Sequence, residues 1–471
     1  MAQDWVVLKF GGTSVAGGSQ WATIAALLQQ RQAQGYRVVL VCSAVAGMTN
    51  ELTVLADSPD CQQIRQRIIE RHRGLSADLG VPEADWLESA THWLDRCTAD
   101  LRQGGGFASR AELLAAGEWL STRIGAAYLR QQSFRVRWED ARKVLVAQPE
   151  PDLSPARQWL SGSCTAAEDR DLRARWNKLD THVITQGYIA GTVDGRTALL
   201  GRGGSDTSAA LIAGRLSARR VEIWTDVPGL FSADPRLVPE ARLLADLNYA
   251  EALEMAASGA KVVHAQCIRA AAATATAVII RATNQPHLLG TRIGPGLAGF
   301  LGVKAITCQR GMVVLLLQNL DARREVGFLA GVFATFRRHG VSIDGVATSE
   351  TTTTVALNAP ANQLDRAAMD ALVADLAVQC RVTVYANCVC VNLVGSSVRT
   401  CLGRLQSAMA FFDAHPLLML SQSANDLCLS MLVEDGGHEA LMQAVHRALI
   451  PPPGDDSSPV FGRCWSELVG A

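Results

Sequence analysis

Short apolar runs alternate with longer amphipathic stretches through the N-terminal part of the chain. Trp5–Phe10 and residues 36–42 have the pattern of buried strands, and residues 20–34 between them have helical character. The same rhythm continues downstream at residues 181–190, 209–216 and 221–226. Alternating strands and helices predict an α/β fold with a mostly parallel sheet covered on both faces. Ligands of such sheets bind at the carboxyl ends of the strands.

The pattern changes after the Gly/Pro-rich stretch at residues 290–296. Beyond it we expect two successive rounds of strand, helix, strand, strand, helix and strand, which is the ferredoxin-like order. The first round runs from 312 to 385, and the second begins at 389 without an evident last strand. The expected elements are strands at 312–317, 341–347, 353–358, 381–385, 389–394, 416–421 and 427–433, with helices at 326–339, 361–379, 397–412 and 437–449. The predicted domains are 1–294, 305–386 and 387–455, and residues 60–180 are expected to be mostly helical.

Composition narrows the class of protein. A chain of 471 residues is long enough for two or three domains, and 48% apolar with 19% charged residues is typical of a globular protein. The net charge of −1 does not favour nucleic acid or an anionic membrane as partner. A small ligand or a protein partner is expected instead. The N-terminus has no signal-peptide pattern and no segment reaches 18 consecutive apolar residues, so we expect a cytoplasmic protein. The twelve cysteines are scattered, and the only close pair, Cys388 and Cys390, indicates reduced core cysteines rather than a metal site.

The motif K-F-G-G-T-S-V begins at Lys9, where the first strand ends. Gly11 and Gly12 would let backbone N–H groups approach an anion closely, and the lysine adds a positive charge. The spacing is neither that of a P-loop nor that of a protein kinase. An ordinary turn with a solvated lysine is the alternative interpretation.

Two further Gly-rich or hydroxyl-rich segments follow strand-like runs. In C-S-A-V-A-G-M-T-N, Ser43 and Thr49 could donate hydrogen bonds to a carboxylate, although a plain polar loop has the same composition. In L-G-R-G-G-S-D, Arg202 between glycines is suited to bidentate recognition of a carboxylate or phosphate. Asp206 is expected in the first turn of the following helix, where Ser205 could act as a cap.

Two later segments complete the set. W-T-D-V-P-G-L-F-S-A-D-P-R ends at Arg236 and offers a strand end and a turn for a nucleotide, and G-A-K-V-V-H contributes Lys261. His264 at its end is interpreted as a packed or capping residue. Phosphoryl transfer requires charge neutralisation and positioning, and a carboxylate nucleophile is ionised at neutral pH without a general base. The set therefore fits a kinase that forms an acyl phosphate.

Together these segments resemble the aspartate kinase family of the amino-acid-kinase fold. The resemblance covers nearly the whole chain and rests on seven motifs in order: K-F-G-G-T-S-V, S-A-V-A-G-M-T-N, G-E-W-L-S-T, T-Q-G-Y-I-A, G-R-G-G-S-D-T-S-A-A, W-T-D-V-P-G-L-F-S-A-D-P-R and G-A-K-V-V-H. Within the family the chain looks most similar to kinase halves fused to diaminopimelate decarboxylase. The implied reaction is ATP-dependent phosphorylation of the L-aspartate side chain to 4-phospho-L-aspartate, the first step of lysine, threonine and methionine biosynthesis.

The resemblance also implies roles for individual residues. The implied catalytic groups are Lys9, Asp206 and Lys261. The implied aspartate pocket consists of Ser43, Thr49, Glu118, Arg202, Gly203 and Ser205, with Arg202 on the α-carboxylate and Glu118 on the α-ammonium. The implied ATP site consists of Lys9, Gly11, Gly12, Thr225, Asp226, Phe231, Arg236 and Lys261. Mg²⁺ is expected chiefly on the ATP phosphates, with no metal site built from protein side chains.

Three positions depart from the family pattern. Trp119 follows Glu118 where arginine is usual, Phe231 stands for a common tyrosine, and Ala265 follows His264 in place of proline. None of them removes a charged catalytic group, so an active enzyme is expected.

The C-terminal part resembles paired ACT domains, which in this family sense an amino-acid end product and pair between chains. A homodimer and an effector, lysine or threonine, are therefore implied. The implied effector site consists of Gly327, Phe328, Asp344, Ser349 and Glu350. The side chains of Phe328, Val332, Phe333 and Phe336 are expected to be the core stripe of a helix.

Two alternatives remain open at the level of sequence. The chain could be another amino-acid kinase, of the glutamate or acetylglutamate type. It could also be a catalytically inactive amino-acid sensor that uses only its ACT domains, although the intact Lys9, Asp206 and Lys261 oppose this.

Overall fold

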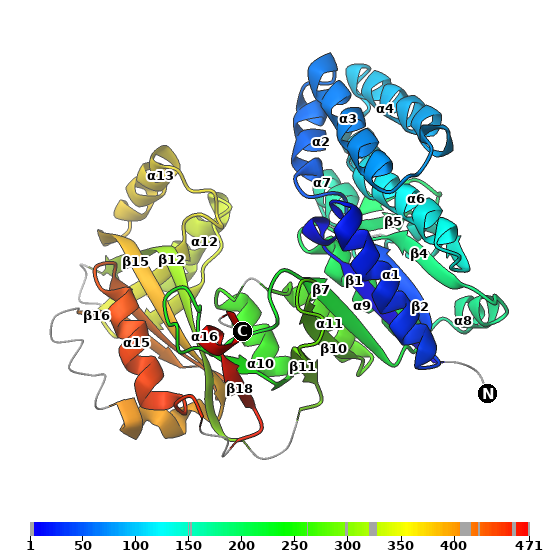
Figure 1. The fold of residues 1–471 in the computed structure, drawn as a ribbon. Helices are drawn as coiled ribbons and strands as arrows, with labels where there is room; N and C mark the ends of the chain where they lie inside the picture. Colours follow the sequence, from blue (N-terminus) through cyan, green and yellow to red (C-terminus); the bar gives the residue numbers. More distant parts are fainter. Residues whose placement is uncertain are drawn as a thin grey trace. The chain divides into compact units, whose positions relative to one another are not determined.

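The computed structural model describes residues 4–148, 150, 153–260, 262–296, 300–319, 327–405, 416–422, 424–454 and 458–469. It divides into two compact units (Figure 1). The first unit contains residues 1–230, 245–253 and 261–296, and the second contains residues 231–244, 254–260 and 297–471. The chain therefore passes repeatedly between the units instead of forming them one after the other. The domain limits inferred from sequence stay a prediction.

An eight-stranded sheet organises the first unit, in the order β3-β4-β2-β1-β7-β10-β11-β9. All neighbours are parallel except β10 and β11. The central strand β1 is an apolar run whose six residues are all buried, so both of its faces are covered, as the pattern predicted. The strands are β1 Trp5–Phe10, β2 Arg37–Cys42, β3 Val136–Trp138, β4 His182–Gln186, β7 Arg220–Thr225, β9 Asp246–Asn248, β10 Ala277–Ala282 and β11 Thr291–Gly294. A separate ladder joins β5 Ile189–Gly191 to β6 Thr197–Leu199.

Helices supply most of the first unit outside this sheet, and the predicted helical character of residues 60–180 is confirmed. They are α1 Gly18–Ala33, α2 Met48–Asp57, α3 Gln62–Asp78, α4 Leu87–Arg102, α5 Gly106–Leu114, α6 Ala116–Gln131, α7 Pro155–Leu160, α8 Arg170–Asn177, α9 Gly204–Arg215, α10 Tyr249–Ala257, which continues into the second unit, and α11 Ala265–Ala273. Figure 1 shows α2, α3 and α4 side by side as one helical layer. Helices α1 and α6 approach so closely that a Cβ on Gly125 would lie 1.8 Å from the Trp21 ring. Among the described helices, none is long and apolar enough to cross a membrane.

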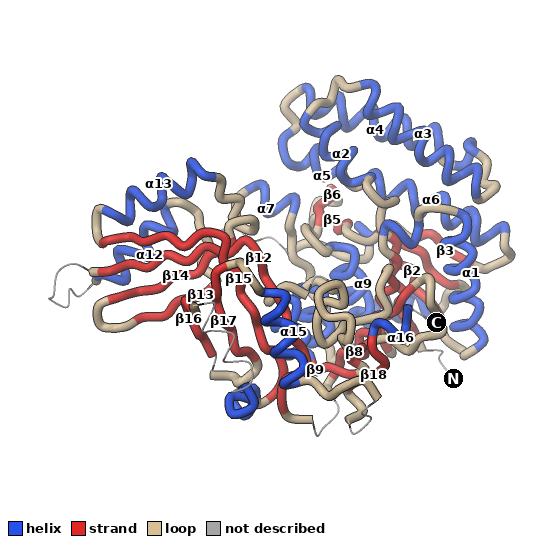
Figure 2. Tube along the Cα trace, turned by 60° about the vertical axis from the view of Figure 1, so that its left-hand side comes forward, coloured by secondary structure: helices blue, strands red, loops and turns tan. Residues whose placement is uncertain are grey.

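The second unit is built on a six-stranded antiparallel sheet, in the order β13-β14-β12-β15-β17-β16 (Figure 2). Its strands are β12 Gly302–Gln318, β13 Gly345–Thr348, β14 Thr352–Asn358, β15 Arg381–Ser396, β16 Leu417–Gln422 and β17 Cys428–Glu434. Its remaining elements are α12 Phe328–Arg338, α13 Arg366–Ala377, η4 Val398–Leu405, α15 His438–Leu449 and α16 Trp465–Val469, together with a ladder of β8 Arg242–Leu244 and β18 Phe461–Cys464.

Two ferredoxin-like halves share the long strands β12 and β15. The first half lies within the second along the chain, because it is formed by residues between the two parts that make up the second. Residues 312–318 of β12 pair with β14 and with residues 381–388 of β15, which closes the first half around α12 and α13. Residues 302–310 of β12 pair with residues 389–396 of β15, which pairs in turn with β17. The last strand of the second half, which the sequence did not reveal, therefore precedes the first half in the chain. Gly311 (φ +73°) lies between the two parts of β12.

Several predicted elements of the second unit need correction. Residues 381–385 and 389–394 form one strand, and β13 begins only at Gly345. The predicted helix at 397–412 is a 3₁₀ helix over residues 398–405, and 406–415 lie outside the described residues. Val332 and Phe336 are buried in the core, but Phe333 is 37% exposed, so its assignment to the core stripe was wrong. All twelve cysteines are free, and most of them are buried.

Candidate active site

Three neighbouring strands of the sheet, β2, β1 and β7, carry six of the residues selected from the sequence at or just beyond their carboxyl ends: Lys9, Gly11, Gly12, Ser43, Thr225 and Asp226. Lys9 is the next-to-last residue of β1, and Asp206 lies in the first turn of α9. Lys9 Nζ lies 2.6 Å from Asp206 Oδ1, and the two side chains are only 11% and 12% exposed. A buried ion pair of this kind costs desolvation energy, and its place at the edge of the sheet indicates a functional role.

The turn after β1 is fastened to the loop after β2. The Ala46 N–H donates to the Gly12 carbonyl (3.1 Å), and the Ser43 N–H donates to the Phe10 carbonyl (3.1 Å). A Cβ on Gly12 would lie 2.7 Å from the Ala44 carbonyl oxygen, so this position requires glycine. Gly11 lies next to the lysine ammonium, since a Cβ there would lie 3.6 Å from Lys9 Nζ. The turn therefore presents its backbone next to the lysine ammonium.

Glu118 lies in the first turn of α6 and is 3% exposed. The Ala44 N–H donates to its carboxylate, but burial dominates and raises the pKa of Glu118 to about 8. Among the described residues, Oε2 of this carboxylate has no hydrogen-bond partner. Ser121, one turn further along α6, donates its hydroxyl to the Ser43 carbonyl (2.7 Å). A buried acceptor without a partner is expensive and suits a cationic ligand group.

The Gly-rich segment before α9 is packed too tightly for other residues. Gly201 and Gly203 have positive φ values of +69° and +68°. A Cβ on Gly203 would lie 2.3 Å from the His264 side chain, and one on Gly204 would lie 2.6 Å from Tyr188. Arg202 is exposed between these glycines. The helix begins after Gly203 without a side-chain cap, so the alternative role of Ser205 as an N-cap is wrong.

The predicted nucleotide residues are divided between the units. Thr225 at the end of β7 donates its hydroxyl to Asp226 (3.0 Å), and both lie in the first unit. Phe231 and Arg236 belong to the second unit, where Phe231 packs its ring at 5.3 Å from the Trp465 ring and Arg236 pairs with Asp234. Lys261 lies outside the described residues. The assignment of these positions to the ATP site stays a prediction.

The other departures from the family pattern have local explanations. Trp119 is buried, with its ring 5.2 Å from the Trp93 ring and 5.2 Å from the Arg123 guanidinium. His264 is the N-cap of α11 and accepts a hydrogen bond from the Gln266 N–H, which confirms its interpretation as a capping residue. Ala265 is the first residue of that helix, a position that proline also suits.

Some residues at the same strand ends were not selected from the sequence. Ser14 and Thr283 join their hydroxyls at 2.8 Å, and the Thr283 N–H donates to the Thr225 carbonyl (2.8 Å). Tyr188 follows β4 with a positive φ of +67°, and its N–H donates to the Ser208 hydroxyl. Ser14 lies in the motif K-F-G-G-T-S-V and Tyr188 in T-Q-G-Y-I-A, so these motifs could have pointed to both residues. No motif contains Thr283.

The predicted effector residues lie around the first ferredoxin-like half. Gly327 precedes α12 in a left-handed conformation (φ +107°), and Phe328 packs partly buried against the core. Asp344 Oδ2 accepts the Asn358 N–H at 2.7 Å. Ser349 follows β13 and shares a hydrogen bond with Thr352, and Glu350 is next in the chain. Their role in effector binding stays a prediction.

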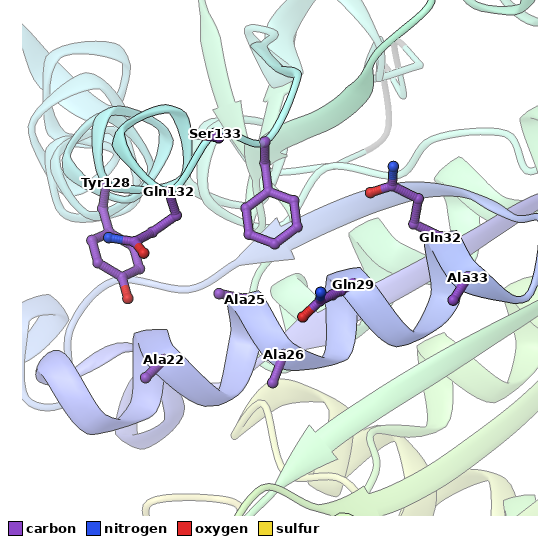
Figure 3. Close-up of a pocket in the computed structure, with 10 residues that line it drawn as sticks. Ala22, Ala25, Ala26, Gln29, Gln32, Ala33, Tyr128, Gln132 and Ser133 are labelled. Carbon is purple, nitrogen blue, oxygen red and sulfur yellow. The ribbon is translucent and has the colours of Figure 1, made fainter.

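A separate cavity of about 760 Å³ lies between α1 and the end of α6. Figure 3 shows alanine and glutamine side chains of α1 opposite Tyr128, Gln132 and Ser133. Its lining contains no lysine or arginine and none of the residues selected from the sequence. It is therefore unsuited to hold a phosphate.

Comparisons with known proteins agree with the fold and the motifs. Residues 4–282 match the model of the amino acid kinase family. The chain is 31% identical over 465 residues to the lysine-sensitive aspartokinase 3 of Escherichia coli, covering 94% of this chain and 99% of that protein. The chain belongs to the aspartokinase family.

Solved aspartokinase structures extend the likeness to three dimensions. The E. coli aspartokinase III complex with aspartate and ADP has a TM-score of 0.77 at 29% identity and covers 95% of this chain and 100% of that one. The complex of the same enzyme with lysine and aspartate has a TM-score of 0.79, with 95% of this chain and 99% of that one covered. The amino-acid-kinase fold followed by ACT-type regulatory domains is confirmed.

The expected special likeness to kinase halves fused to diaminopimelate decarboxylase has no support among these aspartokinases. One relative is a fusion of another kind, the bifunctional aspartokinase/homoserine dehydrogenase of Haemophilus influenzae. It is 28% identical and is matched over 94% of this chain and 56% of that protein.

Proposed function

We propose that this chain transfers the γ-phosphoryl group of ATP to the side-chain carboxylate of L-aspartate, which gives 4-phospho-L-aspartate and ADP. The observation that carries the proposal is the buried carboxylate of Glu118, whose Oε2 has no partner among the described residues, in the unit that holds the Lys9–Asp206 pair. The E. coli relatives named for aspartokinase activity and the structure with aspartate and ADP support the choice of substrates.

In this proposal Lys9 neutralises charge on the transferring phosphoryl group. A carboxylate oxygen of aspartate attacks the γ-phosphorus, and the bond to the β–γ bridging oxygen breaks as ADP leaves. Because the attacking carboxylate is already ionised, no residue needs to remove a proton. Asp206 holds the lysine ammonium in place through the 2.6 Å contact, so the positive charge is positioned before the reaction begins.

Aspartate recognition would use two groups of opposite charge around its α-carbon. Glu118 accepts the α-ammonium, and the exposed Arg202 binds the α-carboxylate through its two-pronged guanidinium. Ser43, Thr49, Gly203 and Ser205 would complete the pocket with neutral donors. Glutamate is longer by one methylene group, so when Glu118 and Arg202 hold its α-carbon, its side-chain carboxylate would not lie where that of aspartate meets the γ-phosphate.

ATP would lie over the turn after β1. Gly11 and Gly12 offer backbone N–H groups to the phosphates, and Thr225, Asp226, Phe231, Arg236 and Lys261 are proposed to complete the site. Within the described part of the chain, no group of three or more His, Cys, Asp or Glu side chains could hold a metal ion. Mg²⁺ is proposed to be held mainly by the nucleotide phosphates, because this ion usually binds through substrate phosphates and few protein ligands.

Regulation by an end-product amino acid is part of the proposal. The E. coli relative is named lysine-sensitive, and a structure of that enzyme contains lysine and aspartate. Lysine is therefore the proposed effector in preference to threonine.

A homodimer formed through the ACT domains is also proposed. Leu329 and Phe333, which are 40% and 37% exposed on α12, offer apolar surface for it. A cytoplasmic location remains a prediction from the sequence.

The direct test is ADP release by the purified chain with Mg·ATP and one acceptor at a time. L-Aspartate should support turnover, whereas L-glutamate and N-acetyl-L-glutamate should not, and added lysine should reduce the rate with aspartate. Turnover with glutamate but not with aspartate would replace the proposed substrate. Tight binding of lysine by a chain that does not bind ATP would favour the inactive sensor.

A further inference from the structure

Residues 231–244 follow directly on the first unit in the chain but are built into the second. Leu230 is held in the first unit, where its N–H donates to the Thr291 hydroxyl (2.8 Å). Phe231, the next residue, packs against Trp465 of α16. This segment carries Phe231 and Arg236, two of the residues proposed for the ATP site. Whatever fixes the segment within the second unit therefore bears on nucleotide binding.

Ser232 is the most completely fixed residue of the segment and is fully buried. Its N–H donates to the Arg242 carbonyl (2.8 Å), and its carbonyl accepts the Ile306 N–H from β12 (2.7 Å). Its hydroxyl accepts the Arg242 N–H (2.8 Å) and lies 2.8 Å from Nε2 of His446. Since the hydroxyl oxygen already accepts from Arg242, its own proton is available for the imidazole nitrogen.

His446 belongs to α15, the helix that follows β17 in the second ferredoxin-like half. It is 3% exposed, and burial lowers its pKa to about 4, so the ring is neutral at physiological pH and Nε2 can accept. One turn earlier on the same helix, Gln443 donates to the Leu237 carbonyl (2.9 Å). Helix α15 thus holds the segment at two points, next to Phe231 and next to Arg236.

We propose that His446 is a positioning residue for the ATP site: through Ser232 it fixes the conformation of residues 231–237, so that α15 of the ACT region sets the affinity for nucleotide. The inference rests on the proposed function for the identity of the nucleotide and for the assignment of Phe231 and Arg236 to its site. The residues proposed to bind aspartate, from Ser43 to Ser205, all belong to the first unit. His446 should therefore affect nucleotide binding and leave aspartate binding unchanged.

The test compares His446→Leu, His446→Gln and Ser232→Ala in the full chain. His446→Leu and Ser232→Ala each remove one partner of a buried hydrogen bond, and each should raise KM for ATP by about tenfold. KM for aspartate and kcat should change by less than about twofold, within the scatter of near-neutral substitutions. The amide of glutamine can still meet the Ser232 hydroxyl, so His446→Gln should return KM for ATP close to the wild-type value.

His438→Leu is the matched control, because His438 is also a buried histidine of α15 but pairs with Asp435 instead of the segment. Its KM for ATP should stay at the wild-type value. The double variant Ser232→Ala/His446→Leu should be no worse than the worse single variant, since both remove the same hydrogen bond. A wild-type KM for ATP in both single variants would overturn the proposal. An equal rise of KM for ATP in His438→Leu would also overturn it. So would a fall in kcat in His446→Leu that is accompanied by a rise in KM for both ATP and aspartate.

Calorimetric titration with Mg·ADP in the absence of an amino acid separates this inference from the proposed function. Weaker Mg·ADP binding by His446→Leu, with wild-type binding by His438→Leu, supports the role of His446 even if the acceptor is not aspartate. Unchanged Mg·ADP binding in a folded His446→Leu variant overturns it even if wild-type turnover with aspartate is normal.

Discussion

The buried carboxylate of Glu118 is available to a ligand, but its burial lowers the stability of the folded chain at neutral pH. Its pKa is raised by burial from 4.5 to about 8, so the folded state binds a proton more tightly than the unfolded state. The contribution of Glu118 to the free energy of unfolding therefore falls as pH rises from about 4.5 to about 8 and does not change further above that. A purely structural role would favour glutamine, which has no charge to bury.

This carboxylate predicts a pH dependence of substrate binding. Aspartate's ammonium needs the ionised form of Glu118, and the ammonium of a free amino acid remains protonated over this range. KM for aspartate should therefore fall as pH rises from about 6 to about 8, by up to tenfold per pH unit. Steady-state kinetics at saturating Mg·ATP measure it. Glu118→Gln should have a high KM that is independent of pH, and a parallel dependence in the variant would contradict the assignment.

Lys9 predicts a loss in the rate of phosphoryl transfer. Lys9→Ala should lower kcat by several orders of magnitude, because the charge of the transition state loses its partner. The ADP-release assay measures the loss, and a thermal melt verifies the fold. Lys143→Ala removes an exposed lysine from the same unit and should retain the wild-type rate. Near-normal turnover of a folded Lys9→Ala chain would remove Lys9 from the catalytic groups.

At the scale of elements, the close packing of α1 against α6 predicts how a substitution at their contact changes the stability of the chain. Gly125 on α6 leaves room for the buried Trp21 ring, whose Nε1 donates to the carbonyl of Val15, the last residue of the motif that begins at Lys9. Gly125→Ala improves helix propensity, yet it should destabilise the chain by about 1–3 kcal/mol through overpacking. Chemical denaturation measures the free energy of unfolding.

A second helical glycine provides the control. Gly74 of α3 is exposed, and a Cβ there would meet no atom within 4 Å. Gly74→Ala should stabilise the chain by about 0.4–1 kcal/mol, because it restricts the unfolded state without a clash. If both substitutions stabilise the chain, the contact between α1 and α6 is not as tight as the structure indicates.

The elements also show what the sequence could and could not predict. Lys9, Ser43 and Asp206 were expected together because the carboxyl ends of parallel strands and the helix starts after them meet at one edge of the sheet. The contact between Ser14 and Thr283 could not be expected, since it joins residues 269 apart in the chain. The last strand of the second ferredoxin-like half was missed for the same reason. Pairing of residues 302–310 with 389–396 crosses the whole first half, and local periodicity contains no information about such partners.

At the scale of the whole molecule, the chain alternates between two units, and this limits any division into consecutive domains. Residues 231–244 were expected in the catalytic domain, residues 1–294, because the Gly/Pro-rich stretch at 290–296 was interpreted as the domain boundary. The structure builds them into the second unit through β12, α15 and β18. The residues Phe231 and Arg236, which are proposed to bind the nucleotide, therefore lie in the same unit as the residues proposed to bind the effector.

The proposed effector site can be tested at Asp344 with two substitutions. They distinguish the loss of its negative charge from the loss of its hydrogen bond to the Asn358 N–H. Asp344→Ala should weaken inhibition by lysine by about tenfold or more, as expected for the loss of a hydrogen bond to a charged group, while basal turnover stays unchanged. The alanine variant also removes the acceptor of the Asn358 N–H. Asp344→Asn keeps an acceptor oxygen for that N–H but has no charge. If the carboxylate binds the effector's ammonium, the lysine concentration for half inhibition rises in both variants. If only the Asn358 contact matters, Asp344→Asn remains as sensitive as the wild type, and the effector site must lie elsewhere.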